Sequence, residues 1–193
     1  MKKCWVMKNI SIALLLLLIT TSITNADEWS GHISGFVGMK SMKGSDWPKL
    51  NRHFAMGFIA DIKKDAWPVS IALDVLDTGD KHEHDGRTDL GHTTEYHLGI
   101  RKIFLSTNST LQPYLGGGVS FMYAELESQQ NNTTTTQDDG DVGAWLGVGM
   151  YLEVTPAFVL GLDVRYSRGK VTLFDKEREA GGVFTGVTGG FQF

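Results

Sequence analysis

Cysteine is nearly absent from this chain, which has one in 193 residues, at position 4. A disulfide framework and a cysteine-based metal site are therefore excluded. Proline is also scarce, with four residues against 23 glycines, and this balance suits long strands better than helices. Beyond the N-terminal leader, no run approaches the roughly 18 consecutive apolar residues of a membrane-spanning helix. The sequence therefore excludes a helical membrane protein.

The first 26 residues have the pattern of a secretory signal peptide. Three lysines lie within the first eight positions, residues 10–19 are apolar except for one serine, and small residues precede Ala26. An apolar stretch of about ten residues is too short for a transmembrane anchor, which needs about 20. We therefore predict cleavage after Ala26, which leaves residues 27–193 as a single domain.

The charge of the chain is acidic, with a formal net charge of −4. The leader holds three basic residues and no acid, so residues 27–193 are more acidic than the whole. This charge argues against nucleic acid or anionic lipid headgroups as the main partner.

Eight segments alternate between apolar and polar residues with a period of two, and helical periodicity fits none of them better. The clearest lies between Phe158 and Tyr166, where Leu160 and Leu162 alternate with Gly161 and Asp163. The predicted strands are 28–43, 52–63, 68–78, 91–105, 111–126, 141–155, 157–174 and 181–193.

The links between these segments alternate in length. Long polar links cover 44–51, 79–90, 127–140 and 175–180, and tight links cover 64–67, 106–110 and 155–156. Long loops outside the cell and short turns in the periplasm are typical of outer-membrane barrels. We therefore predict an all-β fold, an eight-stranded antiparallel up-and-down transmembrane β-barrel.

The alternation alone leaves two orientations, because a soluble barrel such as a lipocalin would point its apolar residues inward. Glycine is frequent on the polar face, as a crowded lumen allows. Aromatic residues also cluster near both ends of the apolar face, like interfacial girdles. They are Phe104, Phe158, Phe191 and Phe193 at the turn end, and Tyr96, Tyr123, Tyr166 and Phe184 at the loop end. We expect the apolar face to contact lipid.

This orientation sends charged and polar side chains into the lumen. A barrel of eight strands encloses room for side chains only, so buried charges must be paired. We interpret them as a structural plug, with a narrow gated path for ions or small solutes as the alternative. The predicted network contains Lys40, Asp61, Asp74, Glu95, His97, Arg101, Glu153, Asp163 and Arg165, and His32, Ser34 and His53 share its face.

Three clusters of residues are candidates for a chemical site. His32-Ile33-Ser34 has the His-x-Ser spacing of a lipid A deacylase barrel, but that motif lies late in its family's chain and faces lipid. Glu95 and His97 share their face with Arg101, which favours a structural network over acid–base chemistry. The link at 79–90 contains His82, His84 and several aspartates, which suit only weak binding of a divalent cation. We assign no catalytic residue, metal or cofactor.

The last strand carries a family resemblance. Residues 183–193 alternate to a final Phe191-Gln192-Phe193, behind a secretory leader. This end resembles the small eight-stranded outer-membrane β-barrel superfamily, the group of the OmpA transmembrane domain and OmpX-type proteins. The resemblance implies the outer membrane of a Gram-negative bacterium, lipid surroundings, and recognition of Phe191 and Phe193 by the barrel-assembly machinery.

The family uses one fold for adhesins, anchors, narrow pores and enzymes, so the resemblance leaves the function open. We expect a non-enzymatic scaffold whose loops contact an extracellular ligand or support the envelope. The polar link at 128–141 is expected to be a disordered surface loop. The alternatives are a narrow channel for ions or small or apolar solutes and, third, a lipid-modifying enzyme.

Overall fold

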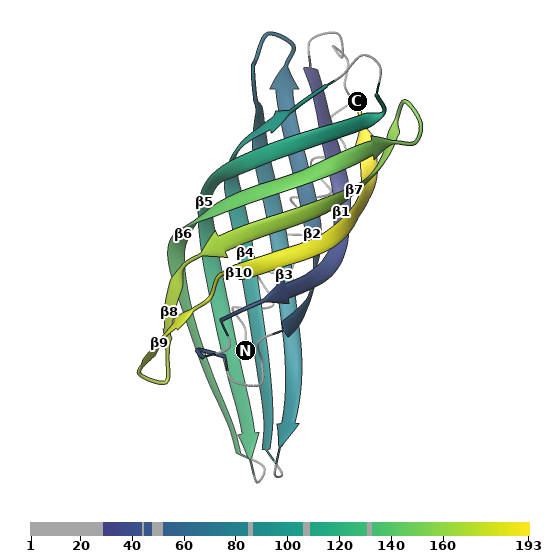
Figure 1. The fold of residues 1–193 in the computed structure, drawn as a ribbon. Helices are drawn as coiled ribbons and strands as arrows, with labels where there is room; N and C mark the ends of the chain where they lie inside the picture. Colours follow the sequence, from purple (N-terminus) through teal and green to yellow (C-terminus); the bar gives the residue numbers. More distant parts are fainter. Residues whose placement is uncertain (1–28, 44, 48–51, 85–86, 106–108, 131–132) are drawn as a thin grey trace.

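The computed structural model describes residues 29–193 except 44, 48–51, 85–86, 106–108 and 131–132, so the predicted leader lies outside the described residues. The described chain forms ten strands (Figure 1). They are β1 (Trp29–Ser41), β2 (Arg52–Lys64), β3 (Ser70–His84), β4 (Arg87–Ile103), β5 (Leu111–Gln130), β6 (Thr133–Glu153), β7 (Phe158–Arg168), β8 (Lys170–Leu173), β9 (Lys176–Glu179) and β10 (Gly182–Gln192).

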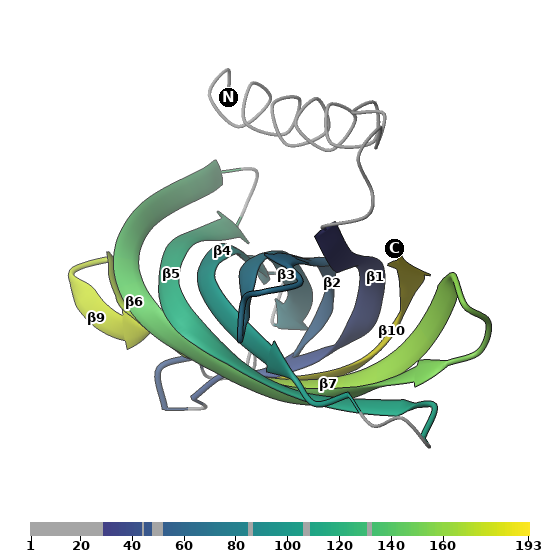
Figure 2. The same cartoon turned by 90° about the horizontal axis from the view of Figure 1, so that it is seen from above.

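Eight of these strands close into an antiparallel barrel in the order β1-β10-β7-β6-β5-β4-β3-β2. Figure 2 shows the curved wall from above, with β9 beside β6. Closure is made by β1 and β10, and Gly31 and Phe193 exchange two backbone hydrogen bonds of 2.9 and 3.1 Å at its end. The eight-stranded antiparallel barrel predicted from the alternation is confirmed. The hairpin β8–β9 forms a separate two-stranded sheet.

The two faces of the wall differ as the alternation predicts. On β7, Leu162 is 55% exposed and Asp163 is 1% exposed, because successive side chains point to opposite faces. The other barrel strands repeat the alternation of exposed apolar residues with buried residues, over the part of each strand that lies in the closed barrel. The apolar outer face suits lipid. No helix in the described part of the chain is long and apolar enough to cross a membrane.

Phe184 is an exception to the predicted outer girdle. Its neighbours Val183 and Thr185 point outward, so Phe184 must point inward, where it is 1% exposed. Its ring lies 4.9 Å from that of Phe36, and Ala55, Ile59 and Leu76 complete the cluster. The prediction of Phe184 as a lipid-facing residue was therefore wrong, and the lumen has an apolar layer as well as charges.

Three links that the sequence predicted as loops contain strands, and in the link at 175–180 the strand is β9. β3 continues to His84 and β4 begins at Arg87, while β5 continues to Gln130 and β6 begins at Thr133. Opposite residues such as Ser128 and Thr135 are in register, so the described part of the expected disordered loop at 128–141 is paired strand. Threonine is β-branched and favours strands, which explains why this polar segment pairs. β7 also stops at Arg168, short of the predicted strand end at 174.

We expect Phe184→Ala to lower the free energy of unfolding by about 3–5 kcal/mol, because a buried aromatic ring is replaced by a cavity. Val187→Ala on the lipid-facing side of β10 is the control and should cost about 1 kcal/mol or less. Urea unfolding in phospholipid bilayers measures both. Equal effects of the two substitutions would contradict the inward placement of Phe184.

Candidate functional site

The centre of the lumen is organised by Asp74 on β3, which lies between two arginines. Arg101 Nη2 donates to both carboxylate oxygens of Asp74, at 3.1 and 2.9 Å, and Arg101 Nη1 donates to Asp61 at 3.1 Å. Arg165 Nη1 lies 3.5 Å from Asp74, and Arg165 Nη2 lies 3.1 Å from Asp163. All five side chains are buried. This centre therefore pairs two guanidinium groups with three carboxylates, one more acidic than basic group.

A second group of polar residues joins this centre from the loop side. Lys40 Nζ donates to Glu95 at 2.5 Å, to Thr93 at 3.1 Å and to the carbonyl of Ala180 at 2.7 Å. His97 Nε2 lies 2.7 Å from Glu95, and its Nδ1 accepts from Arg165 at 3.4 Å. Hydrogen bonds and ion pairs thus form one connected network from Lys40 to Asp61.

Aromatic rings enclose this network, and their contribution was not part of the sequence prediction. Trp145 stacks on His97 at 5.3 Å, and Arg165 lies over the rings of Trp145 and Phe36 at 5.7 and 5.6 Å. Tyr114 donates its hydroxyl to Asp163 at 2.5 Å. These rings fill the space between the charges and exclude water from them.

The glycines of the inner face make room for these rings. A Cβ on Gly149 would lie 2.3 Å from the Tyr114 ring, a distance that no side chain allows. The glycines near Trp145 in the sequence indicated that the inner face makes room for a ring. The sequence did not show that the ring beside Gly149 is Tyr114, which comes from β5.

The structure places eight of the nine predicted residues in the network. They are Lys40, Asp61, Asp74, Glu95, His97, Arg101, Asp163 and Arg165. Glu153 lies apart, half-buried near the turn end, where it accepts from Gln112 at 3.4 Å. Its separation follows from its position near the end of β6, outside the reach of either arginine.

The loop end of the barrel is covered by an apolar cluster, here called the cap. Its members come from the first long link, the inner face of β5 and the segment that contains β8 and β9. They are Met42, Trp47, Met122, Ala124, Leu126, Val171, Leu173 and Ala180, with Phe174 against them. Trp47 Nε1 donates to the carbonyl of Glu179 at 2.7 Å. The backbone N–H groups of Lys170 and Thr172 donate to Asp141 and Asp139 on β6.

Asp46 connects the two segments of the cap. The backbone N–H of Glu179 donates to its carboxylate at 3.1 Å, and the Ser45 hydroxyl donates at 2.9 Å. These hydrogen bonds favour the charged form and lower the pKa of Asp46 below its ordinary value. The cap is therefore stabilised by an ionised carboxylate.

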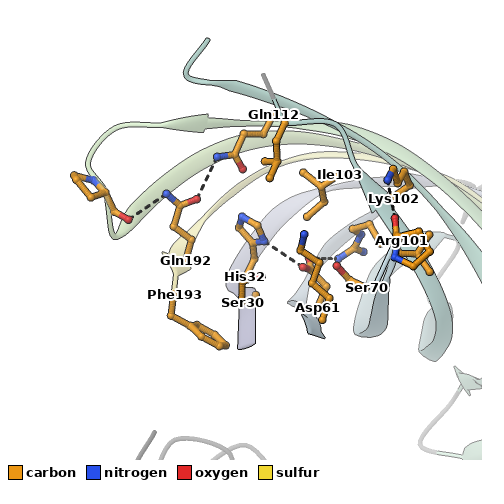
Figure 3. A pocket seen from close by; sticks show the side chains of 16 residues that line it. Ser30, His32, Asp61, Ser70, Arg101, Lys102, Ile103, Gln112, Gln192 and Phe193 are labelled. Carbon is orange, nitrogen blue, oxygen red and sulfur yellow. Dashed lines mark hydrogen bonds and ion pairs between the residues drawn. The ribbon is translucent and has the colours of Figure 1, made fainter. Parts of the chain in front are cut away.

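The turn end contains a cavity of about 250 Å³, here called the turn-end cavity (Figure 3). His32, Asp61, Arg101, Ile103 and Gln112 are among the residues that line it. His32 Nδ1 lies 3.1 Å from Asp61, and its ring stacks on Tyr151 at 4.7 Å. The lumen is therefore closed at the loop end and hollow at the turn end.

The candidate catalytic residues of both pairs are buried inside the lumen. His32 is hydrogen-bonded to Asp61, while the Ser34 hydroxyl is buried and has no hydrogen-bond partner. Glu95 and His97 are enclosed between Lys40 and Arg165. Within the described residues, no group of three or more histidine, cysteine or acidic side chains is placed to hold a metal ion.

Comparison with known proteins gives one family. The model of the outer membrane protein beta-barrel domain matches residues 11–191. No curated protein matches the chain.

Several solved barrels are similar in structure. Neisserial surface protein A has a TM-score of 0.52 at 15% identity, over 85% of this chain and 94% of its own. The attachment invasion locus protein of Yersinia pestis has a TM-score of 0.53 at 15% identity, over 86% of this chain and 98% of its own. OprG of Pseudomonas aeruginosa has a TM-score of 0.55 at 12% identity, over 86% of this chain and 95% of its own. At these identities the likeness shows the fold alone.

Removing the shared carboxylate should destabilise the barrel strongly. We expect Asp74→Asn to lower the free energy of unfolding by about 3–5 kcal/mol, because two buried guanidinium groups lose their common counter-charge. The matched control is Asp77→Asn on the same strand, whose exposed carboxylate pairs with His92 and should contribute about 1 kcal/mol or less. Urea titration compares the two, and a similar loss in both would contradict the network's role.

The cap should loosen in acid. A carboxylate with a depressed pKa contributes stability that is present above its unfolded pKa of about 3.9 and is lost as the pH falls through its folded pKa. We expect the indole N–H resonance of Trp47 to shift below about pH 4. In Asp46→Asn the resonance should no longer follow this titration. A titration unchanged in this variant would assign the transition to another group.

Proposed function

Because the chain belongs to the outer membrane protein β-barrel family, we propose that it is a closed, non-enzymatic scaffold that presents its extended hairpins outside the cell. The observation that carries this proposal is a double obstruction of the lumen. The charge network fills its centre and the cap covers its loop end.

The first obstruction is made of paired charges and rings. Arg101, Arg165, Tyr151 and Phe184 are among the largest fully buried side chains of the described chain. An ion that crossed this layer would have to separate Asp74 from its arginines in a medium of low dielectric constant. Eight strands leave no space around these side chains for a wide aqueous path.

The second obstruction is apolar and independent of the first. The cap joins the first long link to Glu179 through Trp47 and Asp46. Its apolar side chains pack on the inner face of β5, so they present no polar path to an ion. Closure at two levels supports a scaffold more than a channel.

The surface for interaction is built from the hairpins β3–β4 and β5–β6. β5 and β6 have 20 and 21 residues, against 11 in β7 and in β10. The excess length lies at the loop end, because β6 pairs with β7 only from Ala144 onward. In Figure 1 these hairpins extend furthest from the barrel. A paired sheet is a more rigid platform for a ligand than a free loop.

Two features support a role without catalysis and an ordinary route of assembly. Ser34 lies inside the lumen and His32 is bound to Asp61, so the pair does not form a nucleophile and base at the lipid surface. Phe191 is exposed on the lipid-facing side of β10, and Phe193 is exposed just beyond the strand, beside the turn-end cavity. These positions leave both rings accessible to the assembly machinery as an assembly signal.

Conductance in planar bilayers tests the scaffold against the channel. We expect no discrete conductance from the wild-type barrel. We also expect none when only one obstruction is removed, either by Arg165→Ala or by replacing residues 170–179 with a glycine–serine linker. The two changes together should conduct, because the obstructions act in series.

The control is Arg168→Ala, which removes the same residue type from an exposed position and should stay silent in the same linker background. Discrete wild-type conductance that changes in Arg165→Ala would contradict the scaffold and favour a narrow channel.

A further inference from the structure

The turn-end cavity lies at a level of the barrel that the scaffold function does not use. Its lining comes from the ends of the strands where the links are short, among them the start of β1 and the ends of β2 and β4. Short links are periplasmic in this architecture. The cavity therefore opens toward the periplasm, on the opposite side from the cap.

Aromatic residues place this cavity at the depth of the lipid headgroups. Trp29 and Trp67 pack edge to face with ring centroids 5.8 Å apart, and Lys64 lies over the Trp29 ring at 5.1 Å. Tryptophan rings and lysine side chains gather at the interface between membrane and water. Ser30 and Pro68 follow these tryptophans directly in the sequence, and both line the cavity. The cavity and the headgroups of the inner leaflet therefore lie at one level.

Two lysines of the lining have no carboxylate partner among the described residues. Lys63 follows Asp61 by two positions on β2, so it shares the inner face, where it is half-buried. No hydrogen bond or ion pair of Lys63 is found within the described chain. Lys102 Nζ donates to the carbonyl of Pro68 at 2.7 Å. This bond uses one of the three N–H donors of the ammonium group and leaves two for a ligand.

The acidic side chain of the lining does not compensate these lysines, because both of its oxygens are occupied. Asp61 Oδ2 accepts from Arg101 at 3.1 Å, and Asp61 Oδ1 lies 3.1 Å from His32 Nδ1. The chain as a whole is acidic, with a formal net charge of −4, so the unpaired lysines are a local departure from its overall charge. Such a departure inside a cavity attracts an anion.

Apolar side chains at the cavity indicate that this anion belongs to a lipid. Leu105 and Phe193 line the cavity and are also exposed toward the membrane. Val69 and Ile103 add apolar wall, and Figure 3 shows Phe193 at one edge of the cavity and Lys102 at the other. A free phosphate would gain nothing from these walls. A phospholipid matches both surfaces, because its phosphate is anionic and its chains are apolar.

The size of the cavity fits a headgroup and not a whole lipid. Its volume of about 250 Å³ is below the ~300 Å³ at which pockets begin to hold drug-sized ligands. The acyl chains of a bound lipid must therefore stay outside, along the lipid-facing wall.

We propose that the turn-end cavity binds the phosphate of a phospholipid headgroup from the inner leaflet. Lys63 and Lys102 donate to the phosphate oxygens, and the acyl chains leave past Leu105 and Phe193. The charge network stays closed, because the headgroup enters only the turn end.

Native mass spectrometry tests the proposal on the refolded barrel in a nonionic detergent that carries no phosphate. The probes are phosphatidylglycerol, a diacylglycerol with the same chains but no phosphate, and glycerophosphoglycerol, which keeps the phosphate but has no chains. We expect a saturable one-to-one adduct with phosphatidylglycerol. Diacylglycerol should bind about tenfold more weakly or less, and glycerophosphoglycerol should displace the lipid only at a concentration about tenfold higher or more.

Variants test whether the lysines of the cavity hold the phosphate. Lys63→Gln and Lys102→Gln should each weaken the binding of phosphatidylglycerol about threefold or more, and the double variant should lose more than either. The matched control is Lys64→Gln, which removes the same charge one residue further along β2, from the outer side over Trp29. It should bind like the wild type. Resistance to detergent unfolding on gels identifies folded variants, and the comparison of the three probes needs no variant.

Four results would each overturn the proposal. The first is the absence of a saturable adduct with phosphatidylglycerol, and the second is equal binding of diacylglycerol. The third is displacement by glycerophosphoglycerol at a concentration similar to that of the lipid, which would make the ligand a soluble phosphate ester. The fourth is an equal loss in Lys64→Gln and Lys63→Gln, which would assign the binding to the general charge of the periplasmic rim.

Discussion

The structure depends on one constraint, the burial of two guanidinium groups in a lumen that has no bulk water to solvate them. An unpaired charge in such a place costs several kcal/mol, and Asp74 forms ion pairs with both Arg101 and Arg165. Its carboxylate reaches both only because β3, β4 and β7 hold their register. A slip of one residue would turn every side chain of a strand to the opposite face. The ion pairs therefore select the register, and the register places the lipid-facing residues.

Rings and glycines make this arrangement compact. Arg165 is enclosed by Phe36, Trp145 and Phe184, and Gly149 gives the Tyr114 ring its place beside Asp163. Rings over a guanidinium group replace part of its hydration through the quadrupole of their faces. Large and small side chains thus alternate across strands, as close packing in a narrow barrel requires.

The period-two pattern predicted the strands, the closure and the residues that would share the lumen, because alternation depends only on local sequence. It did not predict which arginine meets which carboxylate, since that depends on the relative shift of strands distant in sequence. Phe184 was placed outside because it is aromatic, although its odd-numbered neighbours occupy that face. The polarity of the threonine-rich segment predicts a loop, whereas the β-propensity of threonine and the pairing of β5 with β6 make it a strand.

The two ends of the lumen use the same carboxylate differently. Asp61 Oδ2 accepts a hydrogen bond from Arg101, which belongs to the closed centre. Asp61 Oδ1 lies next to His32 Nδ1, and His32 lines the turn-end cavity. Asp61 therefore links the charge network of the centre to the lining of the turn-end cavity, because each of its two oxygens contacts a side chain of one of them.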